Sequence, residues 1–312
     1  MLHYVHQVAL DCVGLVCFHL PLEFQEAVRQ AIHCAMRGYV EMHKYRYLYF
    51  VIMFTAYILI ICSNSTIVCL IVIHKNLHEP MYIFIAALLL NSVLYSTNIY
   101  PKLLIDFLSE KQLISYPLCL FQAYVYYTLA TSEFLLLAAM SYDRYVSICK
   151  PLQYPTIMRK TTVNVFLLLA WLVPACEIAV SLALYANIKL CSFSLKGIFC
   201  NSSIYSLQCG RSVALTVYGV FMLVNIALLP LLFILFTYTR ILLISYRSCK
   251  TVRNKAAQTC LPHLLVLINS SSFVTYDVLV VRLESDFPKT ARLVMALQMI
   301  TYHPPIFSIN KY

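Results

Sequence analysis

Residues 140–154 read MSYDRYVSICKPLQY, a stretch that closes a long apolar segment and opens a basic turn. It places an acid and a base, Asp143 and Arg144, side by side at the end of that segment. Charges inside or at the edge of a membrane are costly and usually mark function. We therefore predict a functional Asp143–Arg144 pair. The alternative is a simple interfacial anchor, in which Arg144 extends to the lipid headgroups.

The composition points to a protein that crosses a lipid bilayer several times. Of the 312 residues, 61% are hydrophobic and 12% are charged, and the mean hydropathy is +0.77. Soluble domains carry about 25% charged residues, so this balance favours a polytopic membrane protein. The net charge of +10 does not indicate nucleic-acid binding, because the basic residues lie in short gaps between apolar runs rather than in one stripe.

Seven apolar stretches are long enough to form membrane-spanning helices, which need about 20 residues each. The runs do not alternate in polarity, which favours helices over a barrel. The sequence therefore predicts an all-α, seven-transmembrane helix bundle over residues 45–312, with an atypical, structureless or loosely helical extension at 1–44. The predicted spans cover about residues 47–73, 81–108, 117–149, 162–186, 212–239, 256–281 and 291–310.

Loop charges predict the orientation of the bundle. The gaps after the first, third and fifth spans are basic, and the other gaps carry charges of both signs. The gap after the fifth span holds no acid and these basic residues: Arg240, Arg247, Lys250, Arg253 and Lys255. Because basic loops stay in the cytoplasm, we predict an extracellular N-terminus and a cytoplasmic C-terminus.

The chain has 13 cysteines without the Cys-x-x-Cys and His spacing of a zinc site, so we predict no metal site and no cofactor. Four of them lie in or beside polar gaps: Cys119, Cys191, Cys200 and Cys209. These four can form disulfides in an oxidising compartment. Four cysteines allow three sets of pairings, and the spacing leaves all of them open.

Four motifs stand in order along the chain: LHEPMY at residues 77–82, PK at 101–102, DRY at 143–145 and KAAQTCLPHL at 255–264. Together they resemble the odorant (olfactory) receptors of the rhodopsin-like G-protein-coupled receptor family, and the wording looks closest to the fish-type branch. The resemblance covers roughly residues 45–305. It implies a multi-pass receptor in the plasma membrane of olfactory neuron cilia. Such a receptor binds a small-molecule odorant and activates a heterotrimeric G protein of the stimulatory, olfactory type.

The resemblance implies a G-protein switch at the cytoplasmic side. Asp143 would hold Arg144 until the helices shift and free the arginine for the G protein, and Tyr145 would extend the same surface. His263 would couple the sixth span to this switch, although a lone histidine there is also a common packing residue. Tyr312 is the only match to the family's Asn-Pro-x-x-Tyr motif, which here reads SINKY. We expect this departure and the unusual ends to mark a divergent or non-functional product, or an incorrectly drawn gene model.

On the extracellular side, the resemblance implies the disulfides Cys119–Cys200 and Cys191–Cys209, and a ligand site between the outer halves of the third, fifth and sixth spans. The predicted ligand-binding residues are Tyr126, Tyr127, Ala130, Thr131, Tyr276 and Asp277. Apolar walls with a few polar groups are typical of small-molecule pockets, although any single tyrosine can equally pack within the bundle. Asp277 would bind a ligand amine, or alternatively would pair with Arg282.

Three further polar residues carry predictions. Glu133 lies 11 residues before Arg144, about three helical turns deeper. The resemblance implies that Glu133 and Asn91 form a sodium-binding or polar core site, and a hydrogen-bonded, purely structural Glu133 is the alternative. Asn201 begins the sequon Asn201-Ser202-Ser203, so we predict that it is glycosylated.

Other functions fit the sequence less well. A transporter or channel is the main different class, but no inverted repeat is visible in the sequence. An enzyme is not indicated, because the sequence has no paired carboxylates, His-x-x-Glu-His cluster or Gly-x-Ser-x-Gly motif. A non-olfactory rhodopsin-like receptor is the remaining alternative.

Overall fold

The computed structural model describes residues 33–36, 45–186, 188–195, 197–210, 212–246, 264–272 and 275. Within these residues, 5 helical segments are long and apolar enough to cross a membrane. They are α3 (Arg46–Ile73), α4 (Pro80–Leu108), α5 (Tyr116–Cys149), α7 (Lys160–Ala186) and the continuous run of α8 (Val213–Met222), the π-helical η5 (Leu223–Leu228) and α9 (Leu229–Tyr246). These helical segments coincide with the first five predicted spans, and the fifth helical segment continues beyond the predicted end at residue 239.

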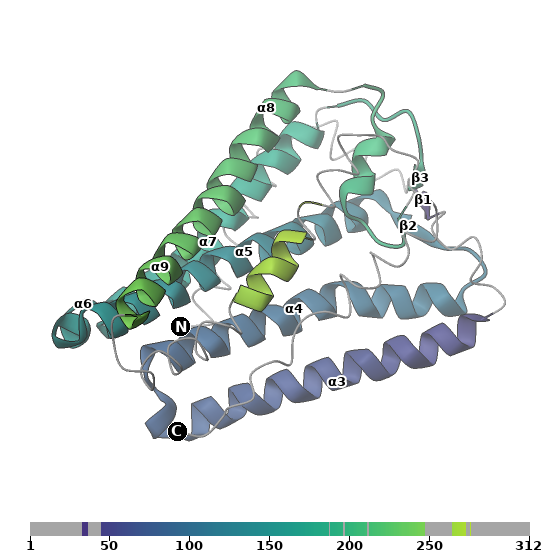
Figure 1. Cartoon of the computed structure of the whole chain (residues 1–312). Coiled ribbons are helices and arrows are strands. Elements are labelled where there is room, and N and C mark those ends of the chain that lie inside the picture. The colour runs from purple at the N-terminus through teal and green to yellow at the C-terminus, as the bar shows by residue number, and fades with distance from the viewer. Residues whose placement is uncertain are drawn as a thin grey trace.

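The last two predicted spans lie mostly or wholly outside the described residues. Residues 264–272 belong to the predicted sixth span and are helical, and Figure 1 shows them in yellow-green in front of α5. The predicted seventh span, residues 291–310, lies outside the described part of the chain. So do residues 1–32 and 37–44 of the predicted N-terminal extension.

Prolines account for several features of these helices. Pro80 and Pro117 lie in the first turns of α4 and α5. Backbone N–H groups in the first turn have no partner within the helix, so proline removes no helical hydrogen bond there. Pro101 and Pro174 lie inside α4 and α7. Helices in membranes tolerate such prolines because neighbouring groups satisfy the freed carbonyls. Pro230 is the second residue of α9, two positions after η5 ends, and its missing donor is a physical reason for the altered hydrogen-bond spacing there.

α5 is the central helix of the bundle. It packs against α4, α7 and α9, as Figure 1 shows. In its most apolar window, 61% of the residues are buried, whereas the share is 17% for α3 and for the α8–α9 segment. Those two segments carry many exposed large apolar side chains. Helices that are apolar all round suit a lipid environment, so α3 and α8–α9 form outer faces of the described bundle.

Two packed clusters of buried side chains lie along α5. The first contains Cys119, Tyr126 and the loop between α7 and α8, and we call this part of the molecule the disulfide end. The second contains Met140 and Val146 and the residues around Asp143, and we call it the Asp143 end. Short turns complete the Asp143 end: η2 (Lys75–Leu77), η3 (Pro151–Gln153) and α6 (Tyr154–Ile157).

A small sheet at the disulfide end corrects one expectation. Strand β1 (His33–Met36) lies between β2 (Leu113–Ser115) and β3 (Ser194–Leu195), antiparallel to the first and parallel to the second. Residues 33–36 are therefore extended, and the expectation of a structureless or helical segment is wrong for them. The fold that was predicted to be all-α therefore also contains these three strands. Strands this short are set by their partners rather than by their own residue pattern, which is why the sequence did not indicate them.

Candidate functional site

The charged pair at the end of α5 is held by a third residue. Asp143 is fully buried, and its Oδ2 accepts hydrogen bonds from Nε and Nη2 of Arg144 at 3.1 and 2.7 Å. Its Oδ1 accepts a hydrogen bond from the hydroxyl of Tyr154 at 2.8 Å. Both carboxylate oxygens are thus paired, which is the condition under which a buried charge is tolerated.

Tyr154 reaches Asp143 because the chain turns back directly after α5. The helix ends at Cys149, η3 makes a tight turn that begins with Pro151, and α6 begins at Tyr154 itself. Burial raises the pKa of the Tyr154 hydroxyl, and the hydrogen bond to Asp143 and its negative charge raise it further. No role for Tyr154 was predicted from the sequence. The signal was available in the proline that follows the helix, since proline forces a turn there.

The other predicted switch residues are placed differently. Tyr145 is half-buried and packs against the apolar cluster of the Asp143 end. His263 and Tyr312 lie outside the described residues. Of the predicted switch residues, the structure therefore describes Asp143, Arg144 and Tyr145, and it adds Tyr154 as a hydrogen-bond partner of Asp143.

The two predicted core polar residues make separate contacts. Asn91 in α4 donates from Nδ2 to the carbonyl of Leu129 at 2.9 Å and accepts from Nε1 of Trp171 in α7 at 3.2 Å. Glu133 accepts a hydrogen bond from the hydroxyl of Ser270 at 2.7 Å. Asn91 therefore links α4, α5 and α7, and Glu133 links α5 to the helical residues of the predicted sixth span. Among the described residues, no group of three or more His, Cys, Asp or Glu side chains could hold a metal ion.

At the disulfide end, the loop between α7 and α8 is bonded covalently to α5. The disulfides are Cys119–Cys200 and Cys191–Cys209, the two pairs that the resemblance implied. Asn201 follows this bond directly and is half-buried. The first disulfide joins residues 81 positions apart, and the second closes the loop on itself over 18 positions.

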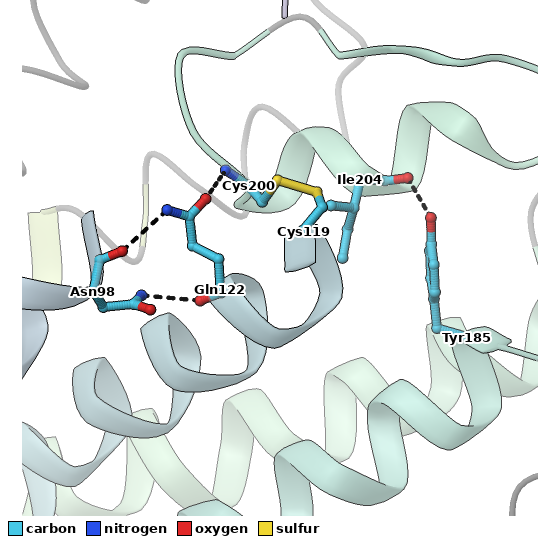
Figure 2. The surroundings of a disulfide bond; sticks show 6 residues. All are labelled: Asn98, Cys119, Gln122, Tyr185, Cys200 and Ile204. Atoms are coloured by element: carbon cyan, nitrogen blue, oxygen red, sulfur yellow. Dashed lines mark hydrogen bonds between the residues drawn. A yellow bond between two sulfur atoms is a disulfide. The ribbon is translucent and has the colours of Figure 1, made fainter. Parts of the chain in front are cut away.

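Figure 2 shows a hydrogen-bond network around the first disulfide. The side-chain carbonyl of Gln122 accepts from the backbone N–H of Cys200 at 3.0 Å, and its Nε2 donates to the backbone carbonyl of Asn98 at 3.1 Å. In return, Nδ2 of Asn98 donates to the backbone carbonyl of Gln122 at 3.0 Å. The hydroxyl of Tyr185 in α7 donates to the carbonyl of Ile204 at 2.6 Å. The loop is thus attached to the ends of α5 and α7 by neutral hydrogen bonds as well.

Gln122 and Asn98 were not predicted from the sequence. Gln122 stands three residues after Cys119, and residues at this spacing share one face of a helix. A polar amide on the same face as the bridging cysteine was the signal available.

Aromatic side chains pack around Tyr126, which lies four residues after Gln122 in α5. The ring of Tyr126 lies 5.3 Å from Tyr95, 5.0 Å from Tyr127 and 5.3 Å from Phe199, which precedes Cys200 in the loop. Ala130 is half-buried against the same cluster. The structure thus brings Tyr126, Tyr127 and Ala130 to one cluster and adds Phe199 to it.

Of the other predicted ligand-binding residues, the structure describes Thr131. The hydroxyl of Thr131 donates to carbonyls of its own helix, those of Tyr127 and Thr128, at 2.7 and 3.1 Å. Tyr276 and Asp277 lie outside the described residues.

These features define a helical, multi-pass membrane protein whose central helix carries an ion pair at one end and a disulfide-linked loop at the other. The family model for olfactory receptors matches residues 52–311. The chain therefore belongs to the olfactory receptor family, which is a family of seven-transmembrane receptors rather than enzymes.

Human olfactory receptors are similar to it over most of their length. Olfactory receptor 6B1 is 35% identical over 253 residues, which cover 80% of this chain and 79% of the relative. Olfactory receptor 2AT4 is 32% identical over 271 residues, or 84% of this chain and 83% of the relative. Olfactory receptor 2T27 is 33% identical over 238 residues, or 75% of each.

Proposed function

We propose that this chain is an odorant receptor that binds a small molecule at the disulfide end and activates a heterotrimeric G protein at the Asp143 end. Family membership supports this function, and the observation that carries the mechanism is that one helix connects the two ends. Tyr126 and Asp143 are 17 residues apart on α5, which is about 25 Å along a helix. A ligand-dependent shift of α5 would therefore act directly on Asp143 and its partners.

The disulfide end is extracellular and the Asp143 end is cytoplasmic in this proposal. Disulfides form in oxidising compartments, which supports placing Cys119–Cys200 outside the cell. Basic loops stay in the cytoplasm, which supports placing the Lys150 and Arg240 side there. Strand β1 pairs with the loops of the disulfide end, which is consistent with an extracellular N-terminus.

The G-protein switch is the release of Arg144 from Asp143. In the described state, both oxygens of Asp143 are bonded, so Arg144 is held against α5. Ligand binding shifts the balance between this state and one in which the arginine contacts the G protein. We propose that Tyr145, His263 and Tyr312 take part in the same step. The partner would be a stimulatory G protein of the olfactory type, met in the ciliary membrane of olfactory neurons.

The ligand site would combine the Tyr126 cluster with residues of the sixth span. Tyr126, Tyr127 and Ala130 supply aromatic and apolar contacts, and Thr131 and Tyr276 add polar ones. We propose that Asp277 binds the amine of a cationic odorant. The fish-type assignment stays a prediction, and so does glycosylation at Asn201.

Glu133 and Asn91 serve helix packing in this proposal. Asn91 holds α4, α5 and α7 together through Leu129 and Trp171. Glu133 joins α5 to Ser270, so a movement of the sixth span would break this bond. Both residues would then favour the resting arrangement of the helices.

Heterologous expression of the full chain with a cyclic-AMP readout, across an odorant panel, tests the function. An odorant receptor gives a concentration-dependent rise in cyclic AMP, and Arg144→Ala removes that rise at an equal amount of surface protein. An odorant-evoked current that needs no G protein would instead support the channel alternative.

Replacing Asp277 with Asn should weaken responses to cationic odorants selectively, and unchanged concentration–response curves would remove that assignment.

A further inference from the structure

Strand β1 pairs with two different loops of the disulfide end. The sheet order is β2–β1–β3, so β1 is the middle strand. Its residues Cys34 and Ala35 face Ile114 and Leu113 of the loop between α4 and α5. On its other side, Ala35 and Met36 face Ser194 and Leu195 of the loop between α7 and α8. In the described part of this sheet, β2 and β3 are therefore not neighbours, and each of them pairs with β1.

Burial shows that β1 is packed into the bundle rather than laid on it. Cys34 is 0% exposed, and its partner Ile114 in β2 is 1% exposed. On the other side of the strand, Leu195 of β3, the partner of Met36, is 0% exposed. Cys34 belongs to the same packed cluster as Tyr116, at the start of α5, and Tyr185, near the end of α7. Burial raises the pKa of the Cys34 thiol, so the thiol is neutral and unreactive while the strand is in place.

The loop that pairs with β1 continues directly into the aromatic cluster around Tyr126. Leu195 of β3 stands four residues before Phe199, whose ring lies 5.3 Å from that of Tyr126. The next residue, Cys200, is bonded to Cys119 and to Gln122. The disulfide therefore fixes one end of this loop segment, and β1 fixes the other end.

We propose that β1 is a positioning element for the ligand site: residues His33–Met36 hold the loop between α7 and α8 so that Phe199 stays against Tyr126. This inference rests on the proposed function. Residues 33–36 lie outside the region that the olfactory receptor family model matches. They set how the loop over the ligand site is held.

Thiol labelling of the full chain on intact cells tests whether β1 holds the loop. In a Cys12→Ser/Cys17→Ser background, a membrane-impermeant maleimide should not modify Cys34. A second reporter, Leu195→Cys, should be protected in the same way. Ala35→Pro removes a backbone donor from the middle strand, which a sheet interior does not tolerate. Both reporters should then react at least about tenfold faster, because the strand opens locally.

Matched variants make the labelling result specific. Ala35→Val keeps a residue suited to strands, so it should leave both reporters protected. Cys34→Ala in the Ala35→Pro chain shows how much label belongs to Cys34. If Cys34 reacts equally fast with and without the proline, β1 is not packed. If Leu195→Cys stays protected when β1 is broken, β1 does not hold the loop. Either result overturns the proposal.

A potency measurement tests the link to ligand binding. For an odorant that activates the unaltered receptor, Ala35→Pro should raise the half-maximal concentration about tenfold at equal surface expression, which corresponds to about 1.4 kcal/mol. Ala35→Val should not change it. An unchanged potency in a chain with exposed reporters contradicts the positioning role. If no odorant activates the unaltered chain, the proposed receptor function fails, and the Leu195→Cys reporter still decides whether β1 holds the loop.

Discussion

The two ends of α5 are held by different kinds of bond. At the disulfide end, the loop is joined by a covalent bond between residues 81 positions apart, and by neutral hydrogen bonds that Gln122 accepts and Tyr185 donates. At the Asp143 end, the contacts are an ion pair between neighbours and one tyrosine hydroxyl 11 residues away. Covalent bonds stay closed during signalling, whereas hydrogen bonds and ion pairs exchange. The comparison indicates that α5 has a permanent attachment at one end and a reversible one at the other. We call the Cys119–Cys200 disulfide with its hydrogen bonds the frame, and the contacts of Asp143 with Arg144 and Tyr154 the latch.

The largest effect should come from opening the frame. Cys200→Ser removes the disulfide to Cys119, and the loss of a native disulfide costs about 2–5 kcal/mol. Cys191→Ser opens a loop of 18 rather than 81 positions, so chain entropy predicts a cost about 1 kcal/mol smaller. Thermal unfolding of the detergent-solubilised protein measures both. Cys62→Ser, at an exposed free cysteine, is the control and should leave the melting temperature unchanged. Equal melting temperatures for all three would contradict a covalent frame.

Breaking the latch should cost less than opening the frame. Asp143→Asn removes the charge that Arg144 pairs with, and hydrogen bonds to charged groups contribute about 1.5–3 kcal/mol. The Arg144 side chain is 20% exposed, so solvent screening lowers the expected loss to about 2 kcal/mol. The same unfolding assay measures it, with Glu110→Gln at an exposed acid as the control. A stability loss as large as that of Cys200→Ser would remove the difference between the two ends.

The next largest loss of stability should come from removing the neutral hydrogen bonds of Gln122 at the disulfide end. Gln122→Ala leaves the Cys200 N–H without its acceptor and the Asn98 carbonyl without its donor, which costs about 1–2 kcal/mol for buried groups. Because this change is far from Asp143, ligand-independent cyclic AMP should stay at the level of the unaltered receptor. A rise in that level would mean that the frame also controls the latch.

The smallest effect should come from the third member of the latch. Tyr154→Phe removes one hydrogen bond from Asp143 and keeps the ring, so we expect about 1 kcal/mol at this half-buried site. Arg144 stays paired, so ligand-independent cyclic AMP should rise less than in Asp143→Asn. An equal rise in the two variants would show that Tyr154, rather than the ion pair, is the main restraint.

Local features of this protein could be predicted from sequence and distant contacts could not. Hydropathy was sufficient for the first five spans, because a run such as 47–73 without any charge has few other stable environments. The Asp143–Arg144 pair was visible because the two residues are adjacent. The Gln122–Cys200 bond joins residues 78 positions apart, and no local pattern encodes it. The strand at 33–36 is defined by partners in two distant loops, so its own four residues carried no signal.

The most direct test of the latch compares ligand-independent cyclic AMP in three chains at matched surface expression: the unaltered receptor, Asp143→Asn, and Asp143→Asn/Arg144→Ala. Releasing the arginine should raise the basal level severalfold in Asp143→Asn, since a shift of about 1 kcal/mol changes a two-state ratio about fivefold. Removing the released arginine should return it to or below the starting level. An unchanged basal level in Asp143→Asn, or a raised level that persists without Arg144, would contradict the account.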